Sequence, residues 1–235
     1  GGNNRSINPS GKKQLVITGE LGSSPDATII DASGKDRHFK FNQSEIDTNF
    51  VIQNITLYNG EMEGSSEGGG SIIVSQGNPK FHKVIFKANV DSTTYWRGAG
   101  AILVSDRGSV IIDSCIFDGN RKSMYSSNST ANEDYNNYAQ GGALSFDNAQ
   151  SRSIVRGSTF KNNKAYAKYD ARGSAIYMNY AAVDIVNRRD LENAENKEEL
   201  KSKLVDEYND KFSNPDIAAK LGLVDKIIKP SDTRK

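Results

Sequence analysis

A glycine followed by small and apolar residues recurs along this chain and constrains its fold more strongly than any other feature. The clearest copy begins at Gly100 and continues through Ile102. A second recurring phrase places an asparagine three residues after a phenylalanine. The first phrase starts again at Gly70, Gly142 and Gly173, and the second occupies residues 86–89, 117–120 and 160–163. Within each copy the small residue and the phenylalanine are 15 to 17 positions apart, so one unit is repeated.

The repeat predicts a solenoid built from strands. Corresponding residues of successive copies lie 30, 42 and 32 positions apart. A period in this range is typical of units that bury their apolar faces only by stacking. Short β-branched runs between turn residues indicate strands and not helices. We therefore predict an all-β fold, a right-handed parallel β-helix, in which Ile102, Leu144 and Ile176 form one column, followed by a short C-terminal α-helical segment.

The recurring asparagines predict a structural ladder at one corner of the stack. Its members would be Asn59, Asn89, Asn120 and Asn163. Asparagine tolerates the left-handed backbone of a tight corner, and stacked amides can hydrogen-bond along the stack. The alternative is a set of ordinary turn asparagines that do not contact one another.

These two phrases resemble the repeats of bacterial polymorphic outer-membrane proteins and archaeal adhesin-like proteins, which are surface β-helices of pectin-lyase-like architecture. The resemblance covers about residues 14–186. It implies a non-enzymatic surface or secreted module for adhesion or ligand display, located extracellularly or at the cell surface. It transfers no catalytic residue to this chain.

The whole chain sets further limits. A net charge of +1 over 235 residues argues against a nucleic-acid partner. No apolar run is long enough to span a membrane. The single cysteine, Cys115, lies in a strand phrase and is expected to be a buried, inert thiol. Because the chain begins with Gly1 in mid-pattern, we expect a fragment that lacks N-terminal coils and a signal. We predict no cofactor and no metal.

The composition changes near residue 181 and predicts two domains, 1–180 and 181–235. The second segment has 23 charged residues among 55, against 36 in the first 180. Apolar residues there recur every four positions, as Leu200, Leu204 and Tyr208, which predicts an amphipathic helix. This helix either caps the open end of the stack or lies in solvent.

The tail carries a second set of motifs. They are Arg188-Arg189, Asn214-Pro215, Ala218-Ala219, Gly222, Val224-Asp225, Ile227-Ile228 and residues 230–234. In this arrangement residues 181–235 resemble the C-terminal end of biotin-dependent acyl-CoA carboxyltransferase subunits. The resemblance implies a cytoplasmic enzyme whose partner is a biotin-carrier subunit. Such an enzyme moves carboxylate from carboxybiotin to an acyl-CoA. The glycine-rich turns that stabilise the enolate lie upstream in that family. The resemblance therefore implies a chimera whose tail descends from a carboxyltransferase but which lacks the catalytic turns and so has no activity.

Insertions between repeats supply the candidate ligand-binding residues. Tyr95, Trp96 and Arg97 form the first cluster, and the longest insertion adds Tyr125, Tyr135 and Tyr138. Aromatic faces beside polar groups suit a glycan or a surface protein partner. In the alternative, Trp96 packs back onto the stack.

Catalysis of the polysaccharide lyase or hydrolase type is a further alternative. It requires clustered carboxylates for Ca²⁺ and a basic group that accepts a proton. The available residues are Asp106, Asp113, Asp118 and Asp147, with Arg107 and Arg156. They occupy different positions within the repeat, so we expect them to be solvated turn residues. We expect His38 and His82 at the surface or at strand edges.

We therefore predict a non-enzymatic β-helix that binds or displays ligands through its corner loops. The first alternative is a fragment of a biotin-dependent acyl-CoA carboxyltransferase that lacks its catalytic turns.

Overall fold

The computed structural model describes residues 5–20, 22–64, 68–94, 97–124, 138–147, 149, 152–167, 170–179 and 203. The chain divides into two compact units, Gly1–Ala181 and Ala182–Lys235. Lys203 is the described residue of the second unit, so the predicted C-terminal helix lies almost entirely outside the described residues.

The described residues form five sheets in which every strand pair is parallel. Sheet 1 contains β3 (Phe39–Asn42), β7 (Ile72–Gly77), β11 (Ile102–Gly108), β16 (Leu144–Asp147) and β21 (Ile176–Asn179). Sheet 2 contains β1 (Leu15–Thr18), β4 (Phe50–Gln53), β8 (Lys80–His82), β12 (Ile111–Asp113) and β17 (Ile154–Arg156).

Sheet 3 contains β2 (Ile29–Asp31), β5 (Thr56–Tyr58), β9 (Ile85–Lys87), β13 (Ile116–Asp118) and β18 (Thr159–Lys161). Sheet 4 contains β6 (Glu61–Met62), β10 (Val90–Asp91), β14 (Arg121–Met124) and β19 (Lys164–Ala167). The fifth sheet pairs β15 (Tyr138–Gln140) with β20 (Asp170–Arg172), and one 3-10 turn, η1, spans Pro25–Ala27.

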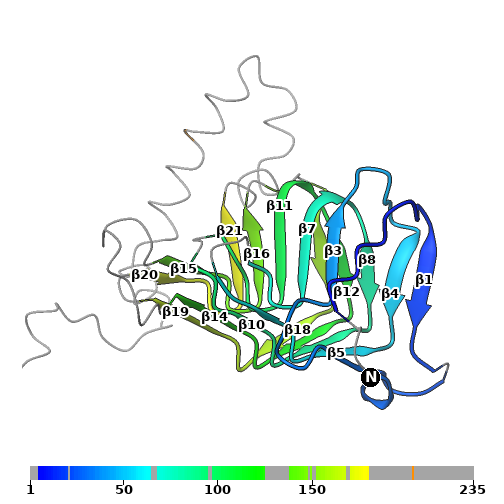
Figure 1. The fold of residues 1–235 in the computed structure, drawn as a ribbon, viewed down its shortest axis with the longest axis horizontal. Coiled ribbons are helices and arrows are strands. Elements are labelled where there is room, and N and C mark those ends of the chain that lie inside the picture. The colour runs from blue at the N-terminus through cyan, green and yellow to red at the C-terminus, as the bar shows by residue number, and fades with distance from the viewer. Residues whose placement is uncertain are drawn as a thin grey trace, which may run out of the picture. The chain divides into compact units, whose positions relative to one another are not determined.

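The chain passes through the four large sheets repeatedly in the same order. Strands β3 to β6 make one passage through sheets 1 to 4, β7 to β10 the next, and β11 to β14 a third. Each inner strand of these four sheets therefore pairs with one strand about one repeat before it and one about one repeat after it, and in Figure 1 the strands of sheet 1 stand side by side. This arrangement confirms the prediction of an all-β fold built from parallel sheets.

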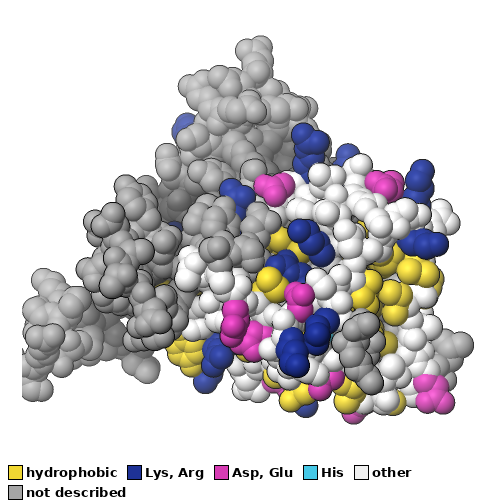
Figure 2. All heavy atoms as spheres, in the orientation of Figure 1, with side chains coloured by type: hydrophobic (Ala, Val, Ile, Leu, Met, Phe, Trp, Pro, Cys, Tyr) yellow, Lys and Arg dark blue, Asp and Glu magenta, His cyan; other side chains and the backbone are white. Residues whose placement is uncertain are grey.

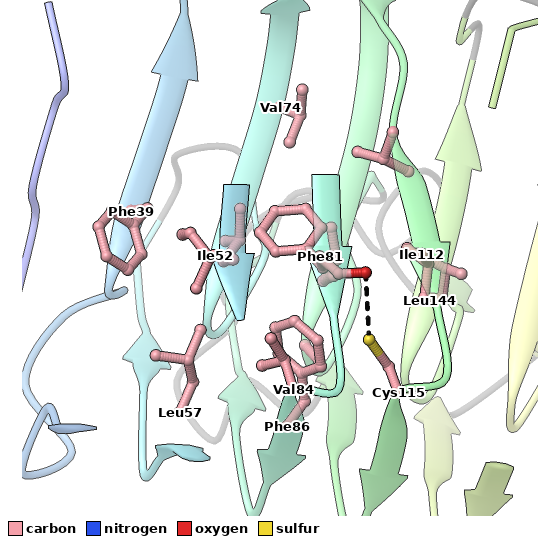
Figure 3. Packing of buried hydrophobic residues seen from close by; sticks show 14 of the residues in the cluster. Phe39, Ile52, Leu57, Val74, Phe81, Val84, Phe86, Ile112, Cys115 and Leu144 are labelled. Carbon is pink, nitrogen blue, oxygen red and sulfur yellow. Dashed lines mark hydrogen bonds between the residues drawn. The ribbon is translucent and has the colours of Figure 1, made fainter. Parts of the chain in front are cut away.

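Equivalent apolar side chains lie above one another inside the stack. Along sheet 1, Ile102 pairs in register with Ile72 on one side and with Leu144 on the other, and Leu144 pairs with Ile176. The side chains of Ile72, Ile102 and Leu144 are fully buried. Figure 3 shows side chains of sheets 1, 2 and 3, Leu144, Ile52 and Leu57 among them, pointing into one shared interior. The hydrophobic core is therefore a continuous column along the stack.

Phenylalanines form the most regular part of this core. The rings of Phe86 and Phe117 stack at a centroid distance of 4.7 Å, and those of Phe117 and Phe160 at 4.6 Å. Their interplanar angles are 11° and 3°. The repeat dictates this geometry because in-register parallel strands place identical side chains one above the other.

Candidate functional site

A row of asparagine amides lies at the corner between sheets 3 and 4. The side-chain N–H of Asn89 donates to Oδ1 of Asn120, and that of Asn120 donates to Oδ1 of Asn163, each at 2.9 Å. Asn89 and Asn120 are fully buried. Each amide also donates to a backbone carbonyl of the preceding coil, Leu57 O and Phe86 O respectively. The row therefore satisfies buried polar groups at a corner where the backbone leaves its sheets.

Asn59 occupies a different position from the one predicted. Register places it opposite Ala88, one residue before the asparagine row, and both have positive φ angles, +56° and +54°. Gly60 takes the place in the row, and its N–H donates to Oδ1 of Asn89 at 2.8 Å. In this copy of the repeat, the asparagine occupies the left-handed corner position, which is Ala88 in the next copy. It therefore lies one residue before the position of the row.

The predicted loop cluster is described only in part. Tyr95, Trp96, Tyr125 and Tyr135 lie outside the described residues, as does the side chain of Tyr138, whose backbone belongs to β15.

Arg97 is the described member of that cluster, and it is held by carboxylates. Its Nε lies 2.6 Å from Oδ2 of Asp147, which is buried in sheet 1, and its Nη1 lies 3.4 Å from Oδ1 of Asp106. An arginine engaged in this way ties its loop to the stack.

The carboxylates considered for Ca²⁺ binding lie on different sheets. Asp106 and Asp147 belong to sheet 1, Asp113 to sheet 2 and Asp118 to sheet 3. Among the described residues, no group of three or more His, Cys, Asp or Glu side chains could hold a metal ion. Asp113 instead accepts from Arg156 at 2.9 Å, and this hydrogen bond is the main reason that its pKa falls to about 2. The spread follows from their different positions within the repeat.

His38 is fully buried, contrary to the prediction of a surface or strand-edge histidine. Its Nε2 lies 2.9 Å from the carbonyl oxygen of Ile30, and its Nδ1 lies 2.9 Å from Oγ of Ser71. Because Nε2 faces a carbonyl, it carries the proton, and Nδ1 accepts from the serine hydroxyl. Burial lowers the pKa of this imidazole below its ordinary value of 6.5.

We expect the buried His38 to make folding sensitive to mild acid. Above about pH 6.5 the imidazole is neutral in both states; below it the unfolded chain takes up a proton that the folded chain excludes. The free energy of unfolding should therefore fall between about pH 7 and pH 5. Urea titrations at the two pH values measure this, and His38→Gln should flatten the dependence. His82→Gln, which replaces the other histidine, should retain it; a slope unchanged by His38→Gln would contradict the assignment.

Cys115 carries no nucleophilic chemistry. Its thiol is buried, its Sγ lies 3.5 Å from the carbonyl oxygen of Phe81 (Figure 3), and burial raises its pKa to about 12. A thiol that stays protonated at neutral pH is a packing group.

The outer face of sheet 3 carries a shallow groove of about 350 Å³. Two outward rows line it, one mainly of isoleucines and one of alternating charge. The lining residues are Asp26, Ile29, Thr56, Tyr58, Ile85, Lys87, Ile116, Asp118 and Lys161. On the face drawn in Figure 2, basic, acidic and hydrophobic side chains are likewise interspersed. Neighbouring charges of opposite sign pair within the sheet, as Lys161 does with Asp118 at 3.4 Å, so the groove has no strong preference for an anion or a cation.

A buried ion pair that the repeated phrases do not predict joins neighbouring coils. Asp91 of β10 and Lys122 of β14 are fully buried, and their Oδ1 and Nζ atoms lie 2.9 Å apart. The two residues face each other in register in sheet 4. An aspartate and a lysine at equivalent positions of two neighbouring repeats could have predicted this pair. The recurring phrases end at Asn89 and Asn120, however, before the strands of sheet 4 begin.

Two comparisons with known proteins concern the end of the chain. The family model described as Carboxyl transferase domain matches residues 151–235, a range that includes strands β17 to β21 as well as the tail. A propionyl-CoA carboxylase carboxyltransferase subunit from Haloferax mediterranei is 40% identical over 60 residues. That match covers 26% of this chain and 12% of the relative. No solved structure matches the chain significantly.

These matches support the carboxyltransferase resemblance and contradict the prediction of a non-enzymatic module for adhesion or display. They give no support to an extracellular location or to a glycan or surface protein partner. In the described part of the chain, no helix is long and apolar enough to cross a membrane. The prediction was wrong because it inferred a function from a fold alone, and one fold can serve many functions.

Proposed function

We propose that this chain carries the C-terminal segment of a biotin-dependent acyl-CoA carboxyltransferase and serves carboxyl transfer to a short acyl-CoA of the propionyl-CoA class. The observation that carries the proposal is the 40% identity to a propionyl-CoA carboxylase carboxyltransferase subunit. The match to the family model described as Carboxyl transferase domain, over residues 151–235, also supports it. On this proposal the partner is a biotin-carrier subunit, and the reaction takes place in the cytoplasm.

The first 180 residues act, on this proposal, as a right-handed parallel β-helix that precedes the carboxyltransferase segment, residues 181–235. The repeated passage through sheets 1 to 4 and the stacked side chains support the β-helix. The charged tail with its four-residue apolar period supports a helical segment after it. The match covers 12% of the relative's length, so the proposal concerns this one segment of the carboxyltransferase.

The chain by itself supplies no enolate-stabilising turn within the resemblance. Carboxyl transfer to an acyl-CoA passes through an enolate, and its developing charge needs backbone donors placed in advance. In the family these donors lie upstream of the segment that resembles this tail. We therefore expect the isolated chain to give no carboxylated product with propionyl-CoA and carboxylated biotin carrier.

The informative experiment is a segment exchange. Residues 181–235 replace the corresponding end of the Haloferax mediterranei subunit, and propionyl-CoA carboxylation is measured with the biotin carrier present. We expect the hybrid to retain activity within about tenfold of the parent, a loss of about 1.4 kcal/mol or less in transition-state stabilisation. The control is the same subunit ended at the junction, which should be inactive. A hybrid as inactive as this control would refute the proposal.

A further inference from the structure

The buried Asp91 and Lys122 side chains form a closed constellation with Thr93. The Thr93 hydroxyl oxygen lies 2.7 Å from Oδ1 of Asp91 and 3.0 Å from Nζ of Lys122. It therefore bridges the amine and the carboxylate oxygen that the amine contacts. All three side chains are fully buried. A hydroxyl that contacts both partners can carry a proton from one to the other.

The second carboxylate oxygen of Asp91 lies among backbone donors. Its Oδ2 accepts from the N–H of Gly69 at 3.0 Å and from the N–H of Ala99 at 2.9 Å. Two backbone N–H groups on one oxygen, in a dry site, are the arrangement that stabilises the oxyanion of an acyl-transfer intermediate. Asp91 is thus held with one oxygen toward the amine and the other between two fixed donors.

Two glycines close the loops over this pair. A Cβ atom on Gly68 would lie 1.7 Å from Oδ2 of Asp91, and one on Gly98 would lie 2.1 Å from it and 2.9 Å from Nζ of Lys122. Only residues without a side chain allow such close approach. The side chains that these glycines cover are fully buried, and burial lowers the pKa of the Lys122 amine, which favours the neutral amine that the attack requires.

We propose that Lys122 and Asp91 condense into an intrachain amide that joins β14 to β10. The proton that leaves Nζ passes through the Thr93 hydroxyl to Oδ1, and the neutral amine attacks Cγ of Asp91. The negative charge of the tetrahedral intermediate forms on Oδ2, between the N–H groups of Gly69 and Ala99. Nζ then gives a second proton, again through the Thr93 hydroxyl, to Oδ1. The charge on Oδ2 reforms the carbonyl as the Cγ–Oδ1 bond breaks, Oδ1 leaves as water, and an amide bond between Nζ and Cγ remains. An ammonium and a carboxylate are converted into an amide and one water, so no oxidant or further reactant is needed.

The cross-link would hold two adjacent coils of the stack together. Coils in a repeat protein contact only their neighbours, and they can separate one at a time. Asp91 and Lys122 are 31 residues apart in sequence and belong to adjacent coils. The amide closes one coil covalently. This inference is independent of carboxyl transfer, and it concerns the parallel sheets alone.

The test is the mass of the purified full chain after denaturation. We expect a mass lower by one water than the sequence requires. Trypsin should leave residues 88–97 joined to residues 122–152, because an acylated Lys122 is no longer a cleavage site. Full sequence mass together with cleavage after Lys122 would show an ordinary ion pair and would overturn the proposal.

Variants distinguish the amide from other losses of water. Lys122→Arg keeps the positive charge and should restore the full sequence mass. Asp91→Asn should lose ammonia in place of water and still give the joined peptides. Thr93→Val should slow cross-linking in freshly made protein, whereas Thr93→Ser keeps the hydroxyl and should cross-link at nearly the rate of the unaltered chain. Loss of water that persists in Lys122→Arg would contradict this assignment.

Discussion

Replacing Phe117 with alanine is expected to lower the free energy of unfolding by about 4 kcal/mol. Phe117 is fully buried and is the middle ring of the stacked trio, at 4.7 Å from the Phe86 ring and 4.6 Å from the Phe160 ring. Its removal takes away both ring contacts. It also leaves a cavity that coils in fixed register cannot close by shifting, since strand pairing holds them apart. Guanidinium titration followed by far-ultraviolet circular dichroism measures the loss.

Tyr166→Ala is the matched control for this variant. Tyr166 lies in β19 and is 44% exposed, so its truncation removes an aromatic ring without opening the core. We expect a loss below about 1 kcal/mol. Equal losses in the two variants would show that the phenylalanine stack does not stabilise the fold.

Gly100→Ala is expected to cost about 3 kcal/mol, although it adds only one methyl group. A Cβ atom at this position would lie 2.0 Å from the carbonyl oxygen of Gly142 and 2.4 Å from the backbone nitrogen of Arg121. Both neighbours are backbone, so neither can rotate away as a side chain would. The same approach recurs along the stack, where a Cβ on Gly142 would lie 1.9 Å from the carbonyl oxygen of Ser174. Thermal unfolding monitored by circular dichroism reports the effect.

Gly119→Ala is the control that separates a steric clash, as at Gly100, from the cost of placing alanine at a positive φ angle. Gly119 has a φ angle of +68°, and a Cβ added there meets no atom within 4 Å. Ala88 already occupies the equivalent corner one coil earlier, with a φ angle of +54°. The cost should therefore stay near 1 kcal/mol. If Gly119→Ala proved the more damaging of the two, close approach between coils would not be what requires Gly100.

The repeated phrases predicted the strands and the core because their information is local and repeated. An inward Ile or Phe at a fixed place in each copy must stack on its equivalent once the strands pair in register. The Ile102 column and the ring stack of Phe117 follow directly. Asn59 shows the limit, because a one-residue offset within a loose copy moves a side chain out of the row.

The reaction class that we propose came from the motifs of the tail and not from the repeat. The repeat describes how a chain packs, and packing of this kind is compatible with many activities. The motifs after residue 181 indicated carboxyl transfer to an acyl-CoA, and the matches to carboxyltransferases support this reaction class. The adhesion hypothesis failed because it gave the fold more weight than these motifs.

By itself the sequence determined the period of the stack, the side chains that fill its core and the glycines at which coils approach. Only the tertiary structure decided how the polar groups outside the asparagine row pair: His38 with Ser71, Arg97 with Asp147, and Asp91 with Lys122. The physical reason is that core packing repeats with every coil and can be read from a single copy. The polar pairs each occur once, between residues such as Asp91 and Lys122 that are 31 positions apart. They form only when coils of unequal length come into register.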